Sequence, residues 1–337
     1  MPSSPVSEPA LPTLDDVRDA AARLAGHAVR TPLLDCLTLG ERLGGRVLVK
    51  AEPLQRTGAF KFRGAYNRIS RLGADERRGG VVTFSSGNHG QAVAAVARLF
   101  GLPATVVMPS DAPAVKIAAC RAHGAEIVLY DRVSEDREAV ARRIMDARGA
   151  TLIPPYDDAH IVAGQGTVGL EIAEEAAARG IALDAVLVPC GGGGLIGGTA
   201  TAIKALSPAT AVYAAEPADF DDTTRSLASG TRESVRPGGK SFCDSLLVAT
   251  PGALTFAINR RLLAGAFTVT DAEVAVAMAA AFRDLKLVVE PGGAVALAAL
   301  LAGRYDLRGR TVAVVCSGGN VDAATYARAL ADAAGGA

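Results

Sequence analysis

One lysine in this sequence lies where its side chain could do covalent chemistry. Lys61 is flanked by Phe60 and Phe62, at the start of a helical pattern within the segment 55–65. Burial against apolar rings lowers the pKa of an ammonium group, and a neutral amine can form a Schiff base with an aldehyde. Most lysines near a helix start are simply solvated, so the spacing alone leaves both interpretations open.

A run of glycines has the properties of a phosphate-binding turn. Four consecutive glycines, 191–194, follow the apolar strand pattern 185–188. Each glycine costs about 0.5–1 kcal/mol relative to alanine in a regular element, so several together need a reason. Backbone N–H groups at the N-terminus of a helix, with no side chains in the way, bind phosphate. A tight turn that lets a helix pack closely on a sheet is the alternative.

The same run also satisfies a dinucleotide-binding pattern. Residues 192–197 have the spacing Gly-x-Gly-x-x-Gly, and Glu216 ends the next strand, where an acid would bind ribose. An NAD-dependent oxidoreductase is therefore a rival interpretation.

Two more polar, glycine-rich turns follow strands, at 85–91 and 317–322. Three such turns favour a single cleft at the carboxyl ends of several strands.

Length and composition indicate an α/β protein of two domains. The chain has 337 residues, more than one hydrophobic core usually holds, and half of them are hydrophobic. Its 35 basic residues balance 35 acidic ones, which argues against a nucleic-acid partner. We also expect no membrane association, because no apolar run is long enough to span a bilayer. The 5 cysteines include no Cys-x-x-Cys pair and fit a reducing cytoplasm.

Short β-branched runs alternate with helical patterns from residue 46 onwards, which predicts parallel sheets joined by crossover helices. We also expect a first helix from the capping residue Thr13 to Leu24, and a loop over 229–240. The predicted strands are 46–49, 81–84, 105–108, 126–129, 184–189, 210–215 and 311–316.

Taken together, the motifs resemble the serine/threonine dehydratase and serine racemase family of pyridoxal-phosphate enzymes, over roughly residues 15–330. The resemblance implies a tryptophan-synthase-β-like fold (fold type II) of two three-layer α/β domains with mostly parallel sheets. Residues 1–80 and 158–337 would form the large cofactor-binding domain, and 81–157 a small inserted domain, with the active site between them. The motifs are, in order, Lys50-Ala51-Glu52, 57–65, 85–91, Gly164-Gln165-Gly166-Thr167, 191–195 and Ser317-Gly318-Gly319-Asn320.

The resemblance assigns roles to individual residues. Lys61 would hold the cofactor through its amine and then act as the base at the substrate Cα. Ser86, on the opposite face, could return a proton. The expected cofactor contacts are Phe60 and Lys61, Asn88 at the phenolic oxygen, Ser317 at the ring nitrogen, and Gly191, Gly192, Gly193, Gly194 and Leu195 at the phosphate. The expected substrate-carboxylate contacts are Ser86, Gly87, Asn88 and His89.

An acidic segment resembles the family's divalent-cation site. Glu216 and Asp222 would supply carboxylates and Phe220 its carbonyl, which are hard oxygen ligands suited to Mg or Ca. An acidic turn that caps the helix from Thr223 is the alternative interpretation.

We therefore expect a cytoplasmic pyridoxal-phosphate lyase (EC 4.3.1) that converts a small-molecule β-hydroxy amino acid, L-threonine or L-serine first, to a 2-oxo acid and ammonia. The sequence ends soon after its last predicted strand and helix, which favours a catabolic role, and the family suggests a homodimer. A serine hydroxyl at Ser317 does not keep the pyridine nitrogen protonated as a carboxylate does, which favours rapid loss of a β-leaving group.

Several alternatives stay open. Many dehydratases carry alanine where this chain has Ser86, so serine racemase remains a candidate, as do dehydratases of threo-3-hydroxyaspartate and phenylserine. From other classes, the NAD-dependent oxidoreductase and a non-catalytic pyridoxal-binding carrier remain. Tyr156, Asp157, Asp158 and the segment 240–244 are candidates for contact with the substrate side chain.

Overall fold

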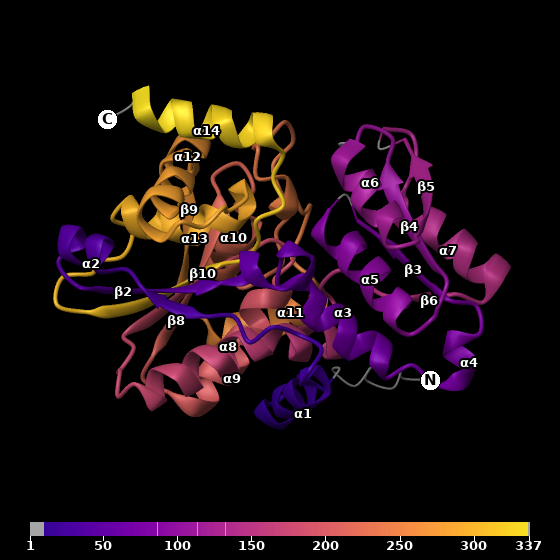
Figure 1. Cartoon of the computed structure of the whole chain (residues 1–337), viewed down its shortest axis with the longest axis horizontal. Helices are drawn as coiled ribbons and strands as arrows, with labels where there is room; N and C mark the ends of the chain where they lie inside the picture. Colours follow the sequence, from indigo (N-terminus) through magenta and orange to yellow (C-terminus); the bar gives the residue numbers. More distant parts are fainter. Residues whose placement is uncertain (1–9, 86, 113, 132, 336–337) are drawn as a thin grey trace.

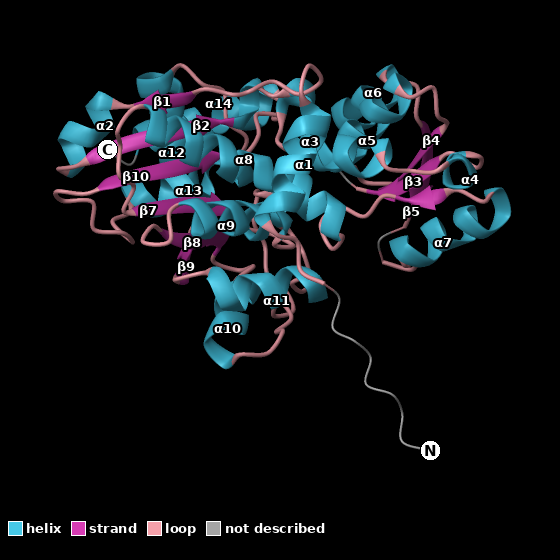
Figure 2. Ribbon diagram, turned by 90° about the horizontal axis from the view of Figure 1, so that it is seen from below, coloured by secondary structure: helices cyan, strands magenta, loops and turns pink. Residues whose placement is uncertain are grey.

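Two sheets organise the chain (Figures 1 and 2). The computed structural model describes residues 10–85, 87–112, 114–131 and 133–335. A six-stranded sheet has the order β1-β2-β10-β7-β8-β9, and a four-stranded sheet the order β5-β4-β3-β6. All neighbouring strands are parallel except β1, which is antiparallel to β2. The predicted α/β architecture with mostly parallel sheets is confirmed.

The strands of the larger sheet are β1 (Leu33–Asp35), β2 (Arg46–Ala51), β7 (Ala185–Pro189), β8 (Ala211–Pro217), β9 (Gly265–Val269) and β10 (Thr311–Cys316). Those of the smaller sheet are β3 (Val81–Phe84), β4 (Ala104–Pro109), β5 (Glu126–Tyr130) and β6 (Thr151–Leu152). The described helices are α1 (Leu14–Leu24), α2 (Leu37–Leu43), α3 (Lys61–Ser70), α4 (Ala74–Arg77), α5 (Asn88–Leu99), α6 (Ala114–Ala122), α7 (Arg137–Arg148), α8 (Ala159–Ala178), α9 (Gly194–Leu206), α10 (Asp222–Ser229), α11 (Ala253–Leu262), α12 (Asp271–Ala280), α13 (Pro291–Leu301) and α14 (Ala323–Gly335). Shorter helical turns are η1 (Glu52–Leu54), η2 (Arg56–Gly58), η3 (Asp244–Leu246) and η4 (Ala281–Leu285).

Every strand predicted from the sequence is present, and β1, β6 and β9 are additional. β1 and β6 have 3 and 2 residues, too few to show a pattern, and β9 is a half-buried edge strand that begins at a glycine. The predicted first helix is α1, which Thr13 caps by accepting a hydrogen bond from Asp16 N. The four strands of the smaller sheet lie within 81–152, whereas the domain boundaries at 80 and 158 stay a prediction.

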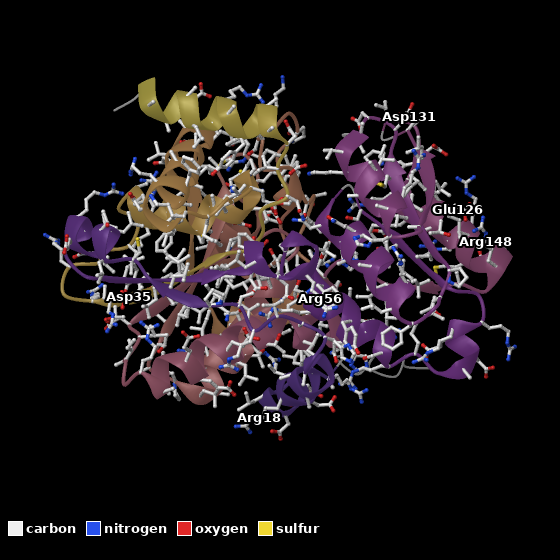
Figure 3. The ribbon with its side chains drawn as sticks, viewed as in Figure 1. Arg18, Asp35, Arg56, Glu126, Asp131 and Arg148 are labelled. Carbon is white, nitrogen blue, oxygen red and sulfur yellow. The ribbon has the colours of Figure 1, made fainter. Side chains whose placement is uncertain are left out.

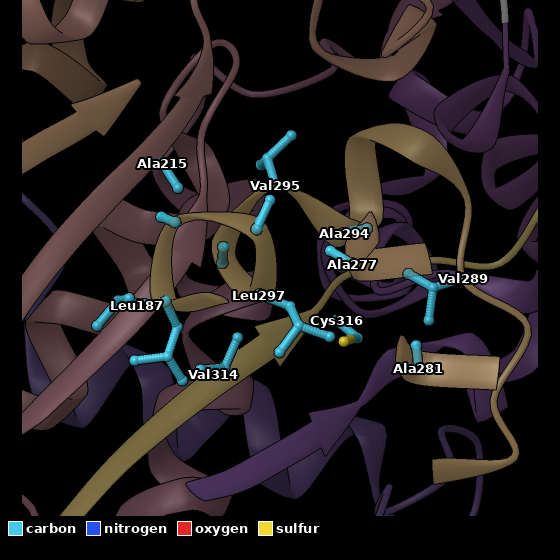
Figure 4. Packing of buried hydrophobic residues seen from close by; sticks show 14 of the residues in the cluster. Leu187, Ala215, Ala277, Ala281, Val289, Ala294, Val295, Leu297, Val314 and Cys316 are labelled. Carbon is cyan, nitrogen blue, oxygen red and sulfur yellow. The ribbon is translucent and has the colours of Figure 1, made fainter. Parts of the chain in front are cut away.

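The larger sheet is buried on both faces. In β2, Val47 and Val49 belong to the hydrophobic cluster that includes α13, whereas Leu48 belongs to the cluster that includes α8 and α9. The helix α13 is apolar all round, and its residues pack on Leu187, Ala215 and Val314 of three neighbouring strands (Figure 4). A helix without a polar face is stable only when it is surrounded. This sheet is therefore the middle of three layers.

The helix α3, which begins at Lys61, lies between the two sheets and packs on α5 and α8 (Figure 1). Its crossing with α8 depends on glycine. A Cβ at Gly64 would lie 2.3 Å from Gln165 Nε2, and one at Gly164 would lie 2.7 Å from Gly64 Cα. The Gly-Gln-Gly motif at 164–166 therefore serves close helix packing, and Gln165 Oε1 accepts a hydrogen bond from Gly64 N at 3.1 Å.

Charged side chains lie mostly outside, as Glu126 and Arg148 do on the smaller sheet (Figure 3). One group of buried charges is an ionic network beneath α3. Arg63 donates to both carboxylate oxygens of Glu52, at 2.9 and 2.8 Å, and to both of Glu171, at 2.6 and 2.9 Å. Lys50 Nζ donates to Glu171 at 2.6 Å. Two cations and two carboxylates compensate one another and join α3 to β2 and α8.

We predict that Glu171→Gln destabilises the protein by about 3 kcal/mol, because it leaves Arg63 and Lys50 buried without their shared anion. The matched control is Glu174→Gln, on the same helix, whose side chain is 48% exposed and pairs with Arg30. Loss of that surface pair costs about 0–1 kcal/mol. Urea unfolding of the two variants measures the difference, and equal losses would contradict the role of the network.

Candidate active site

The glycine-rich turns after β3, β7 and β10 line one cavity between the two sheets. The cavity also receives residues from the start of α3, from the segment before α8 and from the start of α13. The predicted convergence of three turns on one cleft is therefore observed. The sequence-predicted residues that line it are Phe60, Lys61, Gly87, Asn88, His89, Gly191, Gly192, Gly193, Gly194, Leu195 and Ser317. Ser86 lies outside the described residues.

Lys61 presents its amine to this cavity. Its Nζ donates a hydrogen bond to Pro155 O at 2.6 Å and lies 5.1 Å from the centre of the Phe60 ring. Desolvation lowers the pKa of Lys61 to about 8, although the charge of Glu290 opposes this shift. A much larger fraction of the amine is therefore neutral near pH 7 than in an exposed lysine, as nucleophilic attack on an aldehyde requires.

The segment before Lys61 is held by the turn after β10. Gly58 O accepts from Gly319 N at 2.9 Å, Thr57 O from Asn320 Nδ2 at 2.7 Å, and Phe60 N donates to Ser317 O at 3.1 Å. Thr57 has a φ of 61°, an unfavourable conformation for a β-branched residue. Such strain persists only where the surroundings enforce it. The Ser-Gly-Gly-Asn motif therefore positions the lysine as well as lining the cavity.

The turn after β3 leaves the N-terminus of α5 open. This helix begins at Asn88, and its N-cap is Gly87, which has no side chain to occupy the first N–H groups. These groups are available to an anion such as a carboxylate. Ser85 does not cap this helix, because its Oγ accepts a hydrogen bond from Gly87 N at 3.2 Å.

His89 is a buried, neutral imidazole. Its Nε2 lies 3.0 Å from Ile153 O, and its Nδ1 has no partner among the described residues. Desolvation and the charge of Lys61 lower the pKa of His89 to about 3. The carbonyl partner favours a proton on Nε2, which leaves Nδ1 as an acceptor. His89 therefore orients the turn without adding a positive charge to it.

A buried carboxyl group, Glu290, is a functional candidate that the sequence analysis missed. Asn88 Nδ2 donates to Glu290 Oε1 at 2.5 Å, while Asn88 Oδ1 accepts from Asn320 Nδ2 at 2.9 Å. Burial, and then the charge of Asp244, raise the pKa of Glu290 to about 7. Glu290 Oε2 has no partner among the described residues. An acid directly before Pro291 at a helix start is the signal that could have identified it.

The turn after β7 accepts only glycine. Gly193 has a φ of 88°, and a Cβ there would lie 2.7 Å from Asn259 Nδ2. A Cβ at Gly192 would lie 2.3 Å from the Tyr156 ring. Gly194 is the first residue of α9, so the turn ends at a helix N-terminus that lines the cavity. This arrangement fits a phosphate group.

The dinucleotide interpretation fails at Glu216. Its carboxylate is fully buried and accepts from Thr223 N at 3.1 Å and Thr224 N at 2.8 Å, at the start of α10. It does not line the cavity that contains the glycine turn. Glu216 therefore has no access to a ribose bound there, and the Gly-x-Gly-x-x-Gly spacing is coincidental.

Asp222 is close enough to Glu216 to affect its ionisation. Burial, and then the charge of Asp222, raise the pKa of Glu216 to about 8, and burial raises that of Asp222 to about 7. Asp222 Oδ2 is buried and has no partner among the described residues. No group of three or more His, Cys, Asp or Glu side chains that could hold a metal occurs in the described part of the chain. Two carboxylates and the Phe220 carbonyl would therefore need water ligands to complete a cation site.

Of the residues considered for the substrate side chain, only some line the cavity. Tyr156 and Asp244 do. Asp157 instead caps α11, accepting from Leu254 N at 2.9 Å, and Asp158 caps α8, accepting from His160 N at 2.8 Å. Lys116 and Arg137, which line the cavity, were not anticipated.

Comparison with known proteins agrees with this site. The family model described as "Pyridoxal-phosphate dependent enzyme" matches residues 24–318. An L-threo-3-hydroxyaspartate ammonia-lyase of Pseudomonas sp is 44% identical, over 95% of this chain and 99% of the relative. A serine racemase of Schizosaccharomyces pombe is 40% identical, over 95% of this chain and 98% of the relative. The crystal structure of a threonine deaminase from T.th. has a TM-score of 0.87 and 43% identity, covering 92% of this chain and 99% of that one.

We predict that the amine of Lys61 reacts with pyridoxal phosphate at a lower pH than an ordinary lysine does. In cofactor-free protein the reaction rate should rise with pH around a midpoint near 8, because the neutral amine is the reactive form and desolvation lowers its pKa. Stopped-flow absorbance measures the rate, with Nα-acetyl-lysine as the reference. A midpoint near 10 would show that the amine is solvated.

Proposed function

Because the chain belongs to the family of pyridoxal-phosphate-dependent enzymes, we propose that it converts a β-hydroxy amino acid to a 2-oxo acid and ammonia, with the water lost from Cβ regained when the nitrogen leaves. The observation that carries the proposal is the buried Lys61 amine in a cavity shared by three glycine-rich turns. The ammonia-lyase relative at 44% identity supports the same reaction class.

The residues of the cavity fit the cofactor. The glycine turn 191–194 with Leu195 would bind the phosphate, Phe60 would lie against the ring, and Asn88 and Ser317 would contact the phenolic oxygen and ring nitrogen. When bound, pyridoxal phosphate supplies an electron sink for the pair left at the substrate Cα. The chain's own residues would bind the cofactor and the substrate, orient them relative to one another and move protons.

Lys61 and the turn at 87–89 divide this work. The N–H groups at the start of α5 would hold the substrate carboxylate, and the Asn88–Glu290 hydrogen bond would keep that turn in place. The Lys61 amine, with its lowered pKa, would take the Cα proton as a general base. Racemisation would accompany elimination if Ser86 returned a proton from the opposite face.

The proposal predicts that the purified enzyme forms 2-oxo acid from at least one of L-serine, L-threonine and L-threo-3-hydroxyaspartate. Lys61→Ala should lower kcat/KM by roughly 10³-fold or more, because it removes the general base and the attachment point. Lys204→Ala, whose amine bonds to Pro208 O on the surface, is the control. Borohydride reduction followed by peptide mass spectrometry should place the cofactor on Lys61, and attachment to Lys116 would overturn the assignment. Chiral chromatography of residual substrate detects racemisation.

We further propose a divalent-cation site at Glu216, Asp222 and the Phe220 carbonyl. Two buried carboxylates, of which Asp222 raises the pKa of Glu216 and has an oxygen without a partner among the described residues, support a bound cation. The hydrogen bonds from Thr223 and Thr224 would orient Glu216 and leave it with lone pairs for a metal. Hard oxygen ligands favour Mg or Ca.

This site predicts that a chelator lowers the melting temperature by several degrees, because a cation that binds only the folded chain stabilises it by mass action. Adding back magnesium or calcium chloride should restore the melting temperature, whereas sodium chloride of equal ionic strength should not. Glu216→Gln should make the melting temperature insensitive to chelator. A chelator effect that persists in this variant would place the cation elsewhere.

We propose in addition that the enzyme is a cytoplasmic homodimer. All 5 cysteines are buried and free, which suits a reducing compartment. Phe282 and Val288 are 50% and 48% exposed, an apolar surface that a second copy could cover. No helix in the described ranges is both long and apolar enough to cross a bilayer.

A further inference from the structure

The helix α11 receives its N-terminal cap from a residue that is distant in the sequence. Its own N-cap position is Gly252, which has no side chain to accept a hydrogen bond. Asp157, in the segment before α8, supplies the cap instead. Its carboxylate accepts from Ala253 N and Leu254 N at 2.9 Å each and from Thr255 N at 3.2 Å. A local cap stabilises only its own helix, whereas this one also fixes two distant segments relative to one another.

The remaining free N–H group at this helix start reaches the glycine turn after β7. A helix leaves its first four N–H groups without acceptors inside the helix. In α11 the one that Asp157 does not bind, Gly252 N, donates to Gly192 O at 3.4 Å. The Thr255 hydroxyl donates to the same carbonyl at 2.7 Å. The start of α11 is therefore bonded both to Asp157 and to the turn that would hold the phosphate.

One face of α11 also packs against this turn. Thr255 and Asn259 lie four residues apart, hence on the same face of the helix, and both are buried. A Cβ on Gly193 would lie 2.7 Å from Asn259 Nδ2 and 3.0 Å from Thr255 Cβ. The same helix packs on α9, which follows the turn. A shift of α11 would therefore move the surface on which the glycine turn rests.

The hydrogen bond to Gly192 O also sets the direction of the next N–H group. The C=O and N–H groups of a trans peptide point in opposite directions, and no cis peptide bond occurs among the described residues. Gly192 and Gly193 line the cavity, whereas Thr255 does not belong to its described lining. The bond from Thr255 thus holds Gly192 O toward α11 and directs the Gly193 N–H away from it. A donor whose direction is already fixed loses less conformational entropy when an anion binds.

The segment that carries Asp157 contacts the reactive lysine as well. Pro155 O accepts from Lys61 Nζ at 2.6 Å. The ring of the next residue, Tyr156, packs on Gly192, where it leaves no room for a Cβ. Three consecutive residues, 155–157, thus contact the amine, the glycine turn and α11. These contacts link the elements that would bind the aldehyde end and the phosphate end of the cofactor.

We infer that Asp157 is a positioning residue for the cofactor phosphate, which acts through α11 and Thr255 on the glycine turn without touching the cofactor. This inference rests on the proposed function, which places the phosphate at that turn. Asp157 does not belong to the described lining of the cavity, so its substitution removes none of the proposed cofactor contacts. The amine of Lys61 keeps its own supports in Arg63 and in the turn after β10. Loss of the Asp157 carboxylate should therefore weaken the binding of phosphate esters in particular.

Three ligands separate the phosphate from the lysine. Pyridoxal phosphate engages both, pyridoxal has the aldehyde without the phosphate, and deoxypyridoxine phosphate has the phosphate without the aldehyde. After the cofactor is removed from the holoenzyme, Asp157→Ala should raise Kd for both phosphate esters by about five- to tenfold, the range expected for loss of a helix cap. It should raise Kd for pyridoxal by less than about twofold, since the amine is held independently. Absorbance titrations measure the two aldehydes, and calorimetry measures the deoxy compound.

Two further variants distinguish this role from a general loss of structure. Asp158→Ala removes a cap of the same kind from α8, where the carboxylate accepts from His160 N at 2.8 Å and Ile161 N at 2.9 Å. It should leave the ratio of Kd values for pyridoxal phosphate and pyridoxal unchanged. Asp157→Asn keeps a side chain that caps helices well and should restore most of the wild-type ratio. Circular dichroism verifies that each variant is folded.

A double-mutant cycle tests the route through Thr255. Thr255→Val keeps the branched shape but removes the hydroxyl that bonds to Gly192 O, and it should raise the ratio by about tenfold. Asp157→Ala added to Thr255→Val should then raise the ratio by less than about twofold more, because both substitutions break one chain of contacts.

Independent effects that multiply, or a rise in Kd for pyridoxal as large as that for pyridoxal phosphate, would overturn the role of Asp157. Attachment of pyridoxal phosphate to Lys61 without formation of 2-oxo acid from any substrate would instead refute the proposed function. The Kd ratios would still decide the role of Asp157 in that case. Absence of pyridoxal phosphate binding by the wild-type chain would overturn both.

Discussion

The site depends on the way a buried arginine fixes the helix that carries the lysine. Arg63 lies two residues after Lys61 and makes paired hydrogen bonds to Glu52 and Glu171. Paired hydrogen bonds from a planar guanidinium restrict both the position and the rotation of α3. From the other side, the turn after β10 binds the segment before Lys61 through backbone hydrogen bonds. The amine is therefore placed by contacts on both sides of it.

Inside the cavity, burial makes the ionisable groups less charged than they are in water. Desolvation lowers the pKa of Lys61 and of His89 and raises that of Glu290. A lysine that titrates near pH 8, a neutral imidazole and a carboxyl group that titrates near neutral pH leave less fixed charge around the reacting atoms than the same groups carry in water. Anionic ligands then meet mainly backbone N–H groups and the few cations that remain, which lets the position of a single cation influence selectivity.

The sequence was sufficient to predict the architecture and most of the residues that line the cavity near Lys61. Alternating runs predicted the long strands because buried parallel strands are continuously apolar, whereas β1 and β6 are too short to show any pattern. Asp157 and Asp158 were misread because an aspartate that caps a helix looks the same in a sequence as one that lines a cavity. Glu290 and Arg137 could not be identified as cavity residues, because only the three-dimensional arrangement shows which charged groups lie near them in the cavity.

The lining residues of the cavity come from two separate parts of the fold. Lys61, the glycine turn after β7 and Ser317 belong to elements that adjoin the larger sheet, where backbone hydrogen bonds hold them. Arg137 and Lys116 instead come from α7 and α6, which pack on the smaller sheet. A substitution of Arg137 or Lys116 would change the charge in the cavity without removing the backbone hydrogen bonds that hold the segment before Lys61. Relatives with one set of reacting groups could therefore differ in substrate through residues on the smaller sheet alone.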